Sequence, residues 1–133
     1  MDAAKNAPRV LVVDDEESVR TFAGRVLRDG GYDVVYASDG PEALRLVETQ
    51  PPFDVFVVDL VMPQMRGDEL ARRLRLADPD VNVLYFTGYR DRLFTEKLTL
   101  GEHEAFVDKS ATTPAGLREA VSLLLYGHTH GPR

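Results

Sequence analysis

Five short runs of β-branched and aromatic residues recur along the chain, and none shows the strict alternation of a strand with one exposed face. Continuous apolar runs of this kind are typical of strands that are buried on both faces of a sheet. The runs predict five buried strands, over Arg9 to Val13, Asp33 to Tyr36, Asp54 to Val58, Asn82 to Phe86 and Glu104 to Val107.

Between these runs, apolar residues recur at intervals of three and four, which is the spacing of a helix with one buried face. The first helix is expected from about Glu17 to Arg28, where Gly30-Gly31 then stops it. Gly40-Pro41 and Thr113-Pro114 each place a proline in the first turn of a later helix. The apolar positions are Val19, Phe22, Ala23, Val26 and Leu27, then Ala43, Leu44 and Val47, then Leu70, Ala71 and Leu74, and finally Leu117, Ala120, Val121 and Leu124.

Strands that alternate with helices predict an α/β fold with a parallel sheet, since right-handed crossovers place helices on both faces. We expect one flavodoxin-like, doubly wound domain over residues 9–126, with five strands in the order 2-1-3-4-5. Residues 1–8 and 127–133 are expected to be polar tails. The helical pattern is weakest from Asp91 to Leu100, so the fourth helix is expected to be short or mobile.

Chemically reactive side chains follow four of the five predicted strands. Asp14-Asp15 follow the first, Asp59 the third, Thr87 the fourth and Lys109 the fifth. Parallel strands end at one edge of the sheet, and the first and third flank the switch point where a crevice opens. Three carboxylates gathered there would repel one another unless a cation lay between them. The sequence therefore predicts a metal site beside a hydroxyl and an ammonium group, a set suited to handling a phosphoryl group.

Composition narrows the classes of function. The chain has 133 residues, of which 44% are hydrophobic and 29% charged, as in ordinary globular proteins. It has no cysteine, which excludes disulfides and thiolate chemistry, and we expect it in the cytoplasm. A net charge of −6 argues against a nucleic-acid surface, and no apolar segment is long enough to predict a membrane span.

The order and spacing of these side chains resemble the receiver domain of two-component response regulators, over Arg9 to Tyr126. The matching residues are the acid pair Asp14-Asp15, the phosphoacceptor Asp59 followed by Met62, Pro63 and Gly67, the hydroxyl residue Thr87, the aromatic residue Phe106, and Lys109. The family usually has a proline after the lysine, and this chain has Ser110 there.

The resemblance implies a phosphoacceptor switch. Asp59 would accept a phosphoryl group from a histidine kinase or a histidine phosphotransfer protein. Mg²⁺, or Mn²⁺ in its place, would be held by Asp15, Asp59 and the backbone carbonyl of Val61, with Asp14 acting mostly through water. Oxygen ligands of this kind suit a hard divalent cation that keeps several waters.

The resemblance also implies how the transferred group is held and read. Lys109 would pair with Asp59 before transfer and with a phosphoryl oxygen afterwards. Thr87 and the backbone N–H of Gly88 would donate to another oxygen. As Thr87 moves toward the phosphate, Phe106 would turn into the space that it leaves and change the surface offered to a downstream protein.

Two further expectations follow from the family pattern. Val61 and Tyr89 lie at the positions that flank the path of the hydrolytic water, and neither favours that water, so we expect slow loss of the phosphoryl group. The first helix is where receivers usually meet their phosphodonor, which would give Val19 and Phe22 a role in docking.

Other interpretations remain open at this point. The chain could be an unphosphorylated pseudo-receiver scaffold, although its intact acidic residues and lysine argue against that. A Mg²⁺-dependent aspartyl phosphatase is less favoured, because Asp14-Asp15-Glu16 lacks the required second aspartate two residues after the first. We expect no enzyme activity beyond self-phosphorylation and slow dephosphorylation. The resemblance allows a weak homodimer, and Met1 favours a stand-alone regulator over a shuttle or a piece of a longer chain.

Several residues also have plainer interpretations. Phe106 could equally be a core aromatic that never moves. His128 and His130 are expected to lie in a polar tail rather than to bind a metal. Arg72, Arg73 and Arg75 are expected to form a solvated helix face.

Overall fold

The computed structural model of the protein describes residues 7–88 and 100–127. The strands are β1 (Arg9–Val13), β2 (Asp33–Ala37), β3 (Val55–Val58), β4 (Val83–Thr87) and β5 (Glu104–Asp108). The helices are α1 (Glu17–Asp29), α2 (Gly40–Thr49), α3 (Gly67–Ala77) and α5 (Pro114–Tyr126). The predicted fourth helix lies almost wholly in residues 89–99, outside the described residues. None of the described helices combines the length and the apolar character needed to cross a membrane.

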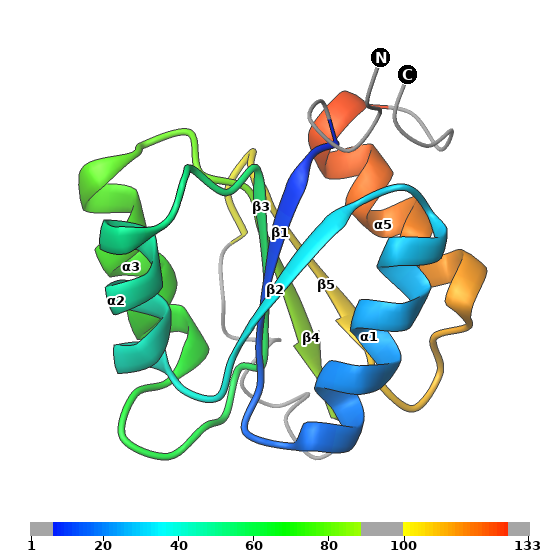
Figure 1. The fold of residues 1–133 in the computed structure, drawn as a ribbon, viewed down its shortest axis with the longest axis horizontal. Coiled ribbons are helices and arrows are strands. Elements are labelled where there is room, and N and C mark those ends of the chain that lie inside the picture. The colour runs from blue at the N-terminus through cyan, green and yellow to red at the C-terminus, as the bar shows by residue number, and fades with distance from the viewer. Residues whose placement is uncertain (1–6, 89–99, 128–133) are drawn as a thin grey trace.

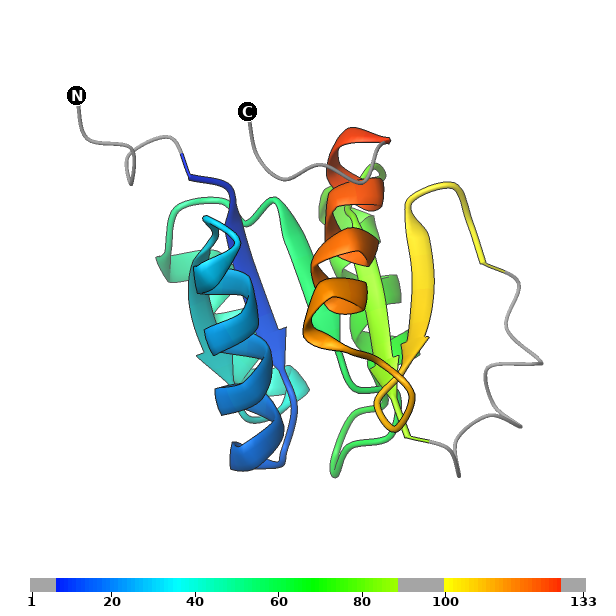
Figure 2. The same ribbon diagram turned by 90° about the vertical axis from the view of Figure 1, so that its right-hand side faces the viewer.

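The strands form one parallel sheet in the order β2-β1-β3-β4-β5, which confirms the predicted flavodoxin-like topology. Figure 1 shows α2 and α3 against one face of the sheet and α1 and α5 against the other. Figure 2 shows α1 and α5 side by side on their face. Because every strand runs the same way, all five carboxyl ends meet at one edge, as the sequence led us to expect.

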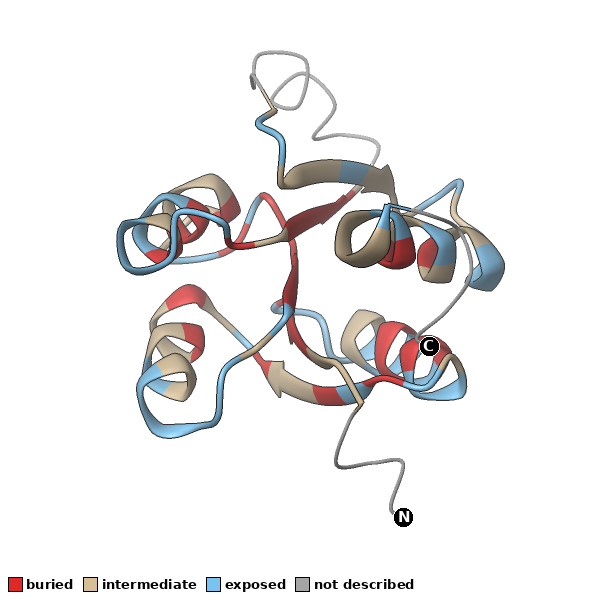
Figure 3. Ribbon diagram, turned by 90° about the horizontal axis from the view of Figure 1, so that it is seen from above, coloured by how far each residue is buried: buried red, intermediate tan, exposed pale blue. Residues whose placement is uncertain are grey.

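Two apolar cores fill the space between the sheet and its helices. Leu11 and Val13 of β1 pack toward α2 and α3, whereas Val10 and Val12 pack toward α1 and α5. Successive side chains of a strand point to opposite faces, so one continuous apolar run supplies both cores. Figure 3 shows this arrangement as a buried central sheet between helices whose buried residues face it.

The helix boundaries follow the local signals. The side chain of Asp39 accepts a hydrogen bond from the Glu42 N–H at the start of α2, and Thr113 does the same for Gly116 at the start of α5. Both α2 and α5 have a proline in the first turn, as predicted. The helix α1 ends at Asp29 and is capped by Gly30, and Gly31 follows with a φ of 96°, a conformation that glycine adopts without strain.

Two details of the predicted strands were wrong. The observed boundaries of β2 to β5 differ from the predicted ones by one residue at one or both ends. In particular, β4 ends at Thr87 and β5 at Asp108, and these two polar residues pair across the strands. The expectation of burial on both faces holds for β1, β3 and β4 but not for the edge strands. In β5 every residue is at least partly exposed, because an edge strand has a neighbour on one side only.

Candidate functional site

The register of β1 and β3 brings Asp14 and Asp59 together. Val13 and Val58 are paired across the two strands, and each aspartate is the next residue in its chain. The Asp59 N–H donates to the Val13 carbonyl at 2.9 Å, which extends the ladder into the loop. Both side chains are buried, with residue exposures of 1% for Asp14 and 4% for Asp59. The structure therefore holds two carboxylates close together and largely out of water.

Asp15 adds a third carboxylate from the solvent side. One oxygen of each of Asp14, Asp15 and Asp59 lies within 4.8 Å of the oxygens of the other two, and Asp15 is exposed. Closely spaced carboxylate oxygens with one side open to water suit Mg²⁺, which takes oxygen ligands and retains part of its hydration shell. The donor set therefore fits the predicted metal.

Lys109 supplies the positive charge of the site. Its Nζ lies 2.8 Å from Asp14 Oδ2 and 3.4 Å from Asp59 Oδ2, and its side chain is 16% exposed. The sequence led us to expect a pair with Asp59, and the structure has the lysine between the two aspartates and nearer to Asp14. Among the residues that the structure describes, one cation thus faces two buried carboxylates and compensates their negative charge only in part.

The electrostatics follow from burial. Burial, together with the neighbouring Asp14 carboxylate, raises the pKa of Asp59 to about 7 against the opposing effect of Lys109. Burial also raises the pKa of Asp14, although Lys109 and the Glu16 N–H oppose it. Burial lowers the pKa of Lys109, but its pairs with the two aspartates outweigh this and leave that pKa above its ordinary value. A bound divalent cation would favour the charged form of both aspartates.

Thr87 and Lys109 are joined through their backbones. Thr87 is the last residue of β4 and is 1% exposed, and its carbonyl accepts the Lys109 N–H at 2.8 Å. Gly88 follows and is half-buried. The predicted phosphate-binding residues therefore come from adjacent strand ends.

The loop after Asp59 is fixed by its contact with the start of α3. The Gly67 N–H donates to the Leu60 carbonyl at 2.8 Å, and a Cβ atom at Gly67 would lie 2.3 Å from the Asp59 carbonyl oxygen. Only glycine allows this approach. Val61 is 40% exposed, and its N–H lies 3.4 Å from Asp59 Oδ1. This loop therefore keeps the exposed residue Val61 beside the Asp59 carboxylate.

The other predicted residues lie on the surface or outside the described residues. Phe106 is 44% exposed on β5, so its interpretation as a core aromatic was wrong. Tyr89, His128 and His130 lie outside the described residues. Arg72 and Arg73 are exposed and pair with Glu69 on the surface of α3. Arg75 differs from that solvated face, because it pairs with the largely buried Glu104 of β5.

Sequence reasoning missed one contact at the site. The Arg20 guanidinium, from the first turns of α1, donates from Nη1 to the Asp14 carbonyl at 2.6 Å. The Asp14 side chain meanwhile accepts the Glu16 N–H at 2.9 Å. Together these bonds fix the turn that carries the acid pair. No signal in the sequence separates Arg20 from a solvated helix arginine, because the contact depends on how the turn folds back on α1.

Comparisons with known proteins agree with this arrangement. The family model described as response regulator receiver domain matches residues 10–122. The alkaline phosphatase synthesis transcriptional regulatory protein PhoP of Bacillus subtilis is 40% identical over 111 residues, which are 84% of this chain and 44% of the relative. The sensor kinase CckA of Brucella abortus is 38% identical over 101 residues, which are 75% of this chain and 11% of the relative.

A solved structure is similar over nearly the whole chain. The response regulator TrrA of Thermotoga maritima, in complex with Mg²⁺ and BeF, has a TM-score of 0.79 and 30% identity, and the match covers 89% of this chain and 99% of that one. The chain spans less than half of the length of either PhoP or CckA. The similarity therefore concerns the domain over residues 10–122.

Proposed function

The chain belongs to the response regulator receiver domain family, and we propose that it is a phosphoacceptor switch in which Asp59 receives a phosphoryl group from a histidine kinase or a histidine phosphotransfer protein. The observation that carries the proposal is the meeting of Asp14, Asp15 and Asp59 with Lys109 at one edge of the sheet. Transfer to a carboxylate brings two anions together, so a site of this kind has to neutralise charge more than it has to supply an acid or a base.

Mg²⁺ would supply most of that neutralisation when it is bound. Asp15, Asp59 and the backbone carbonyl of Val61 would hold it, with Asp14 acting mostly through water. The chain's own residues do the rest. Asp59 offers a carboxylate oxygen in a cluster whose third member, Asp15, is exposed, and Lys109, already 3.4 Å from the Asp59 carboxylate, can follow the charge onto the phosphoryl group. Thr87 and the Gly88 N–H would donate to another phosphoryl oxygen.

The output would be a change of surface read by another protein. Thr87 is linked to β5 through its register partner Asp108, and Phe106 lies two residues earlier on the same strand. We propose that Thr87 moves toward the phosphoryl group and that Phe106, now 44% exposed, turns inward in response. This movement would remove an aromatic surface and change the face that a downstream protein binds.

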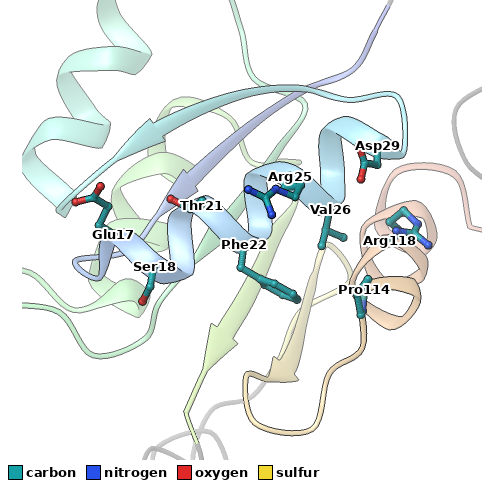
Figure 4. A pocket seen from close by; sticks show the side chains of 9 residues that line it. All are labelled: Glu17, Ser18, Thr21, Phe22, Arg25, Val26, Asp29, Pro114 and Arg118. Atoms are coloured by element: carbon teal, nitrogen blue, oxygen red, sulfur yellow. The ribbon is translucent and has the colours of Figure 1, made fainter.

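The phosphodonor would dock on α1. A hollow of about 770 Å³ lies between α1 and the start of α5, and a smaller one of about 270 Å³ continues to Lys109. Phe22 lines both hollows and is 39% exposed. Figure 4 shows Phe22 pointing from α1 toward Pro114. An exposed aromatic beside a path to the site suits contact with the apolar face of a donor helix.

The test of the function is the intact mass of the protein after incubation with a small-molecule phosphodonor and Mg²⁺. We expect one added phosphoryl group, absent from Asp59→Asn and absent when the metal is omitted. Omission of Mg²⁺ controls for non-specific phosphorylation, and Asp59→Asn keeps the shape of the site while it removes the nucleophile. If Mg²⁺ binds but neither the small donor nor a histidine donor adds a group, the chain is an unphosphorylated scaffold.

A further inference from the structure

The turn that carries Lys109 has an internal set of hydrogen bonds. We call residues 108–112 the Lys109 turn. The Ser110 N–H donates to Asp108 Oδ1 at 2.8 Å, and the Ser110 hydroxyl donates to the same oxygen at 2.7 Å. The backbone carbonyl of Asp108 accepts from the Thr112 hydroxyl and from the Ala111 N–H, the latter at 3.2 Å. Asp108 thus accepts hydrogen bonds from the three residues after Lys109, through both its side chain and its carbonyl.

This closure fixes the backbone from which the lysine side chain starts. On the strand side of Lys109, Asp108 is in register with Thr87, and the Lys109 N–H donates to the Thr87 carbonyl. On the other side, Ser110 donates two hydrogen bonds to the Asp108 carboxylate. A lysine stem is long and rotates freely, so the direction in which it leaves the backbone decides which anion its ammonium group can reach. Here it reaches Asp14 at 2.8 Å and Asp59 at 3.4 Å.

Ser110 stands where the family usually has proline. A proline ring fixes the backbone angle φ and leaves no N–H to satisfy. Serine does not fix φ, and it adds a backbone N–H donor. An aspartate side chain that accepts the N–H two residues later forms a turn of defined shape without a proline. The Asp108 carboxylate accepts both donors of Ser110, which supplies the restriction that the ring would have given.

We propose that Asp108 and Ser110 are positioning residues, and that their hydrogen-bonded turn aims Lys109 at Asp14 and Asp59. The effect of the turn on the rate of phosphorylation rests on the proposed phosphoacceptor function. Its effect on the position of the Lys109 ammonium does not, because the ion pairs of Lys109 exist without phosphorylation. The two can therefore be tested separately.

The test compares Asp108→Ala with a matched control. Asp78, at the opposite edge of the sheet, forms a similar turn in which Asp78 Oδ1 accepts the Asp80 N–H at 3.1 Å. Asp78→Ala therefore removes the same kind of hydrogen bond far from the site. Three quantities are measured in each variant: hydrogen exchange of the Lys109 ammonium by NMR, Mg²⁺ affinity by calorimetry, and the rate of phosphorylation at saturating small-molecule phosphodonor.

We expect Asp108→Ala to expose the Lys109 ammonium to rapid exchange and to lower the maximal phosphorylation rate roughly tenfold, since a small misplacement of a charge-stabilising group is costly. Its Mg²⁺ affinity should be unchanged or tighter, because the competing ammonium is less well placed. Asp108→Asn, which keeps the accepting oxygen, should restore most of the rate, and Asp78→Ala should change none of the three quantities.

The proposal is overturned if Lys109 exchanges as slowly in Asp108→Ala as in the native protein. It is also overturned if Mg²⁺ affinity falls together with the rate, because that pattern indicates a general loss of structure. Should Asp108→Ala fail to fold, Ser110→Ala decides, since it removes only the hydroxyl and should still speed exchange of the ammonium about twofold. If the native protein accepts no phosphoryl group, the proposed function fails, and the exchange measurement still decides the role of the turn.

Discussion

The ammonium group of Lys109 lies 2.8 Å from a carboxylate oxygen of Asp14, a residue that is 1% exposed. The more distant carboxylate of Asp59 shares the same cation at 3.4 Å. Lys109 therefore pairs with two buried carboxylates at once. Both the stability of the site and its affinity for a divalent cation should depend on this arrangement.

Removal of Lys109 should destabilise the metal-free protein. Lys109→Met keeps the length of the side chain but leaves two buried carboxylates without their cation, which should cost about 3 kcal/mol at pH 8. The cost should shrink at pH 5.5, where Asp59, whose pKa is raised to about 7, takes up a proton. Urea unfolding at both pH values, without Mg²⁺, measures the change. Arg73→Met, which breaks an exposed pair with Glu69, is the control and should cost at most about 1 kcal/mol.

The pH dependence of stability follows from the raised pKa of Asp59. In the unfolded chain this carboxyl titrates near 3.8, and in the folded protein at about 7, so between these values the folded state binds a proton that the unfolded state does not. The free energy of unfolding should therefore fall as the pH rises from about 5 to 8, by about 2 kcal/mol for this group.

Asp59→Asn isolates that contribution. The variant lacks the titrating group. The unfolding free energy of the native protein, measured relative to that of the variant, should therefore fall as the pH rises from about 5 to 8. Saturating Mg²⁺ should remove or reverse the trend in the native protein, because the cation stabilises the charged carboxylates. A difference that stays constant from pH 5 to pH 8 would contradict the assignment.

Gly67 should not tolerate a side chain. The Cβ atom of alanine would lie 2.3 Å from the Asp59 carbonyl oxygen and 3.0 Å from Leu60 Cα, so the backbone at Asp59 and Leu60 has to move. We expect Gly67→Ala to cost about 3 kcal/mol and to weaken Mg²⁺ binding. Thermal unfolding and calorimetry test both effects. Gly116→Ala, inside α5, makes the same change where the nearest atom is a side-chain oxygen at 3.2 Å, and it should be close to neutral.

Phe22 should matter for a protein donor and not for a small one. Phe22→Ala removes an exposed ring from the hollow beside α1 and leaves the carboxylate cluster intact. The rate of phosphotransfer from a histidine kinase or phosphotransfer protein should fall about tenfold, in line with the loss of a central aromatic contact. The rate from a small-molecule phosphodonor should not change. Leu76→Ala, which removes a side chain of a residue that is 77% exposed on α3, is the control, and equal effects of the two variants would argue against docking on α1.

The parallel sheet and the two layers of helices could be predicted from the chain because they depend on its pattern of apolar residues. Runs such as Val10 to Val13 supply both cores from successive residues, and parallel strands then require crossover helices. The strand ends were predicted less well. Thr87 and Asp108 are polar, which indicates a loop, yet they continue the backbone ladder as a register pair. Backbone pairing does not depend on the polarity of the side chains.

The composition of the site was equally accessible from the sequence, since Asp14, Asp59 and Lys109 each follow a strand. Their relative placement was not. The nearer pair of Lys109 with Asp14, the bond from Arg20 to the Asp14 carbonyl and the exposure of Phe106 all depend on side-chain directions in three dimensions. A shift of the Lys109 ammonium by less than about 1 Å would decide whether two aspartates share it or Asp59 alone pairs with it.

By itself the sequence determined a parallel α/β domain whose reactive side chains gather at one edge of the sheet, because periodicity sets the elements and parallel strands must end together. Only the tertiary structure decided how those groups share charge and how the lysine is aimed. Burial and distances of a few ångströms set the pKa of Asp59, and the hydrogen-bonded turn of Asp108 and Ser110 sets the direction of Lys109. Both arise from contacts between residues far apart in the chain or from the exact fold of a loop, which no linear pattern records.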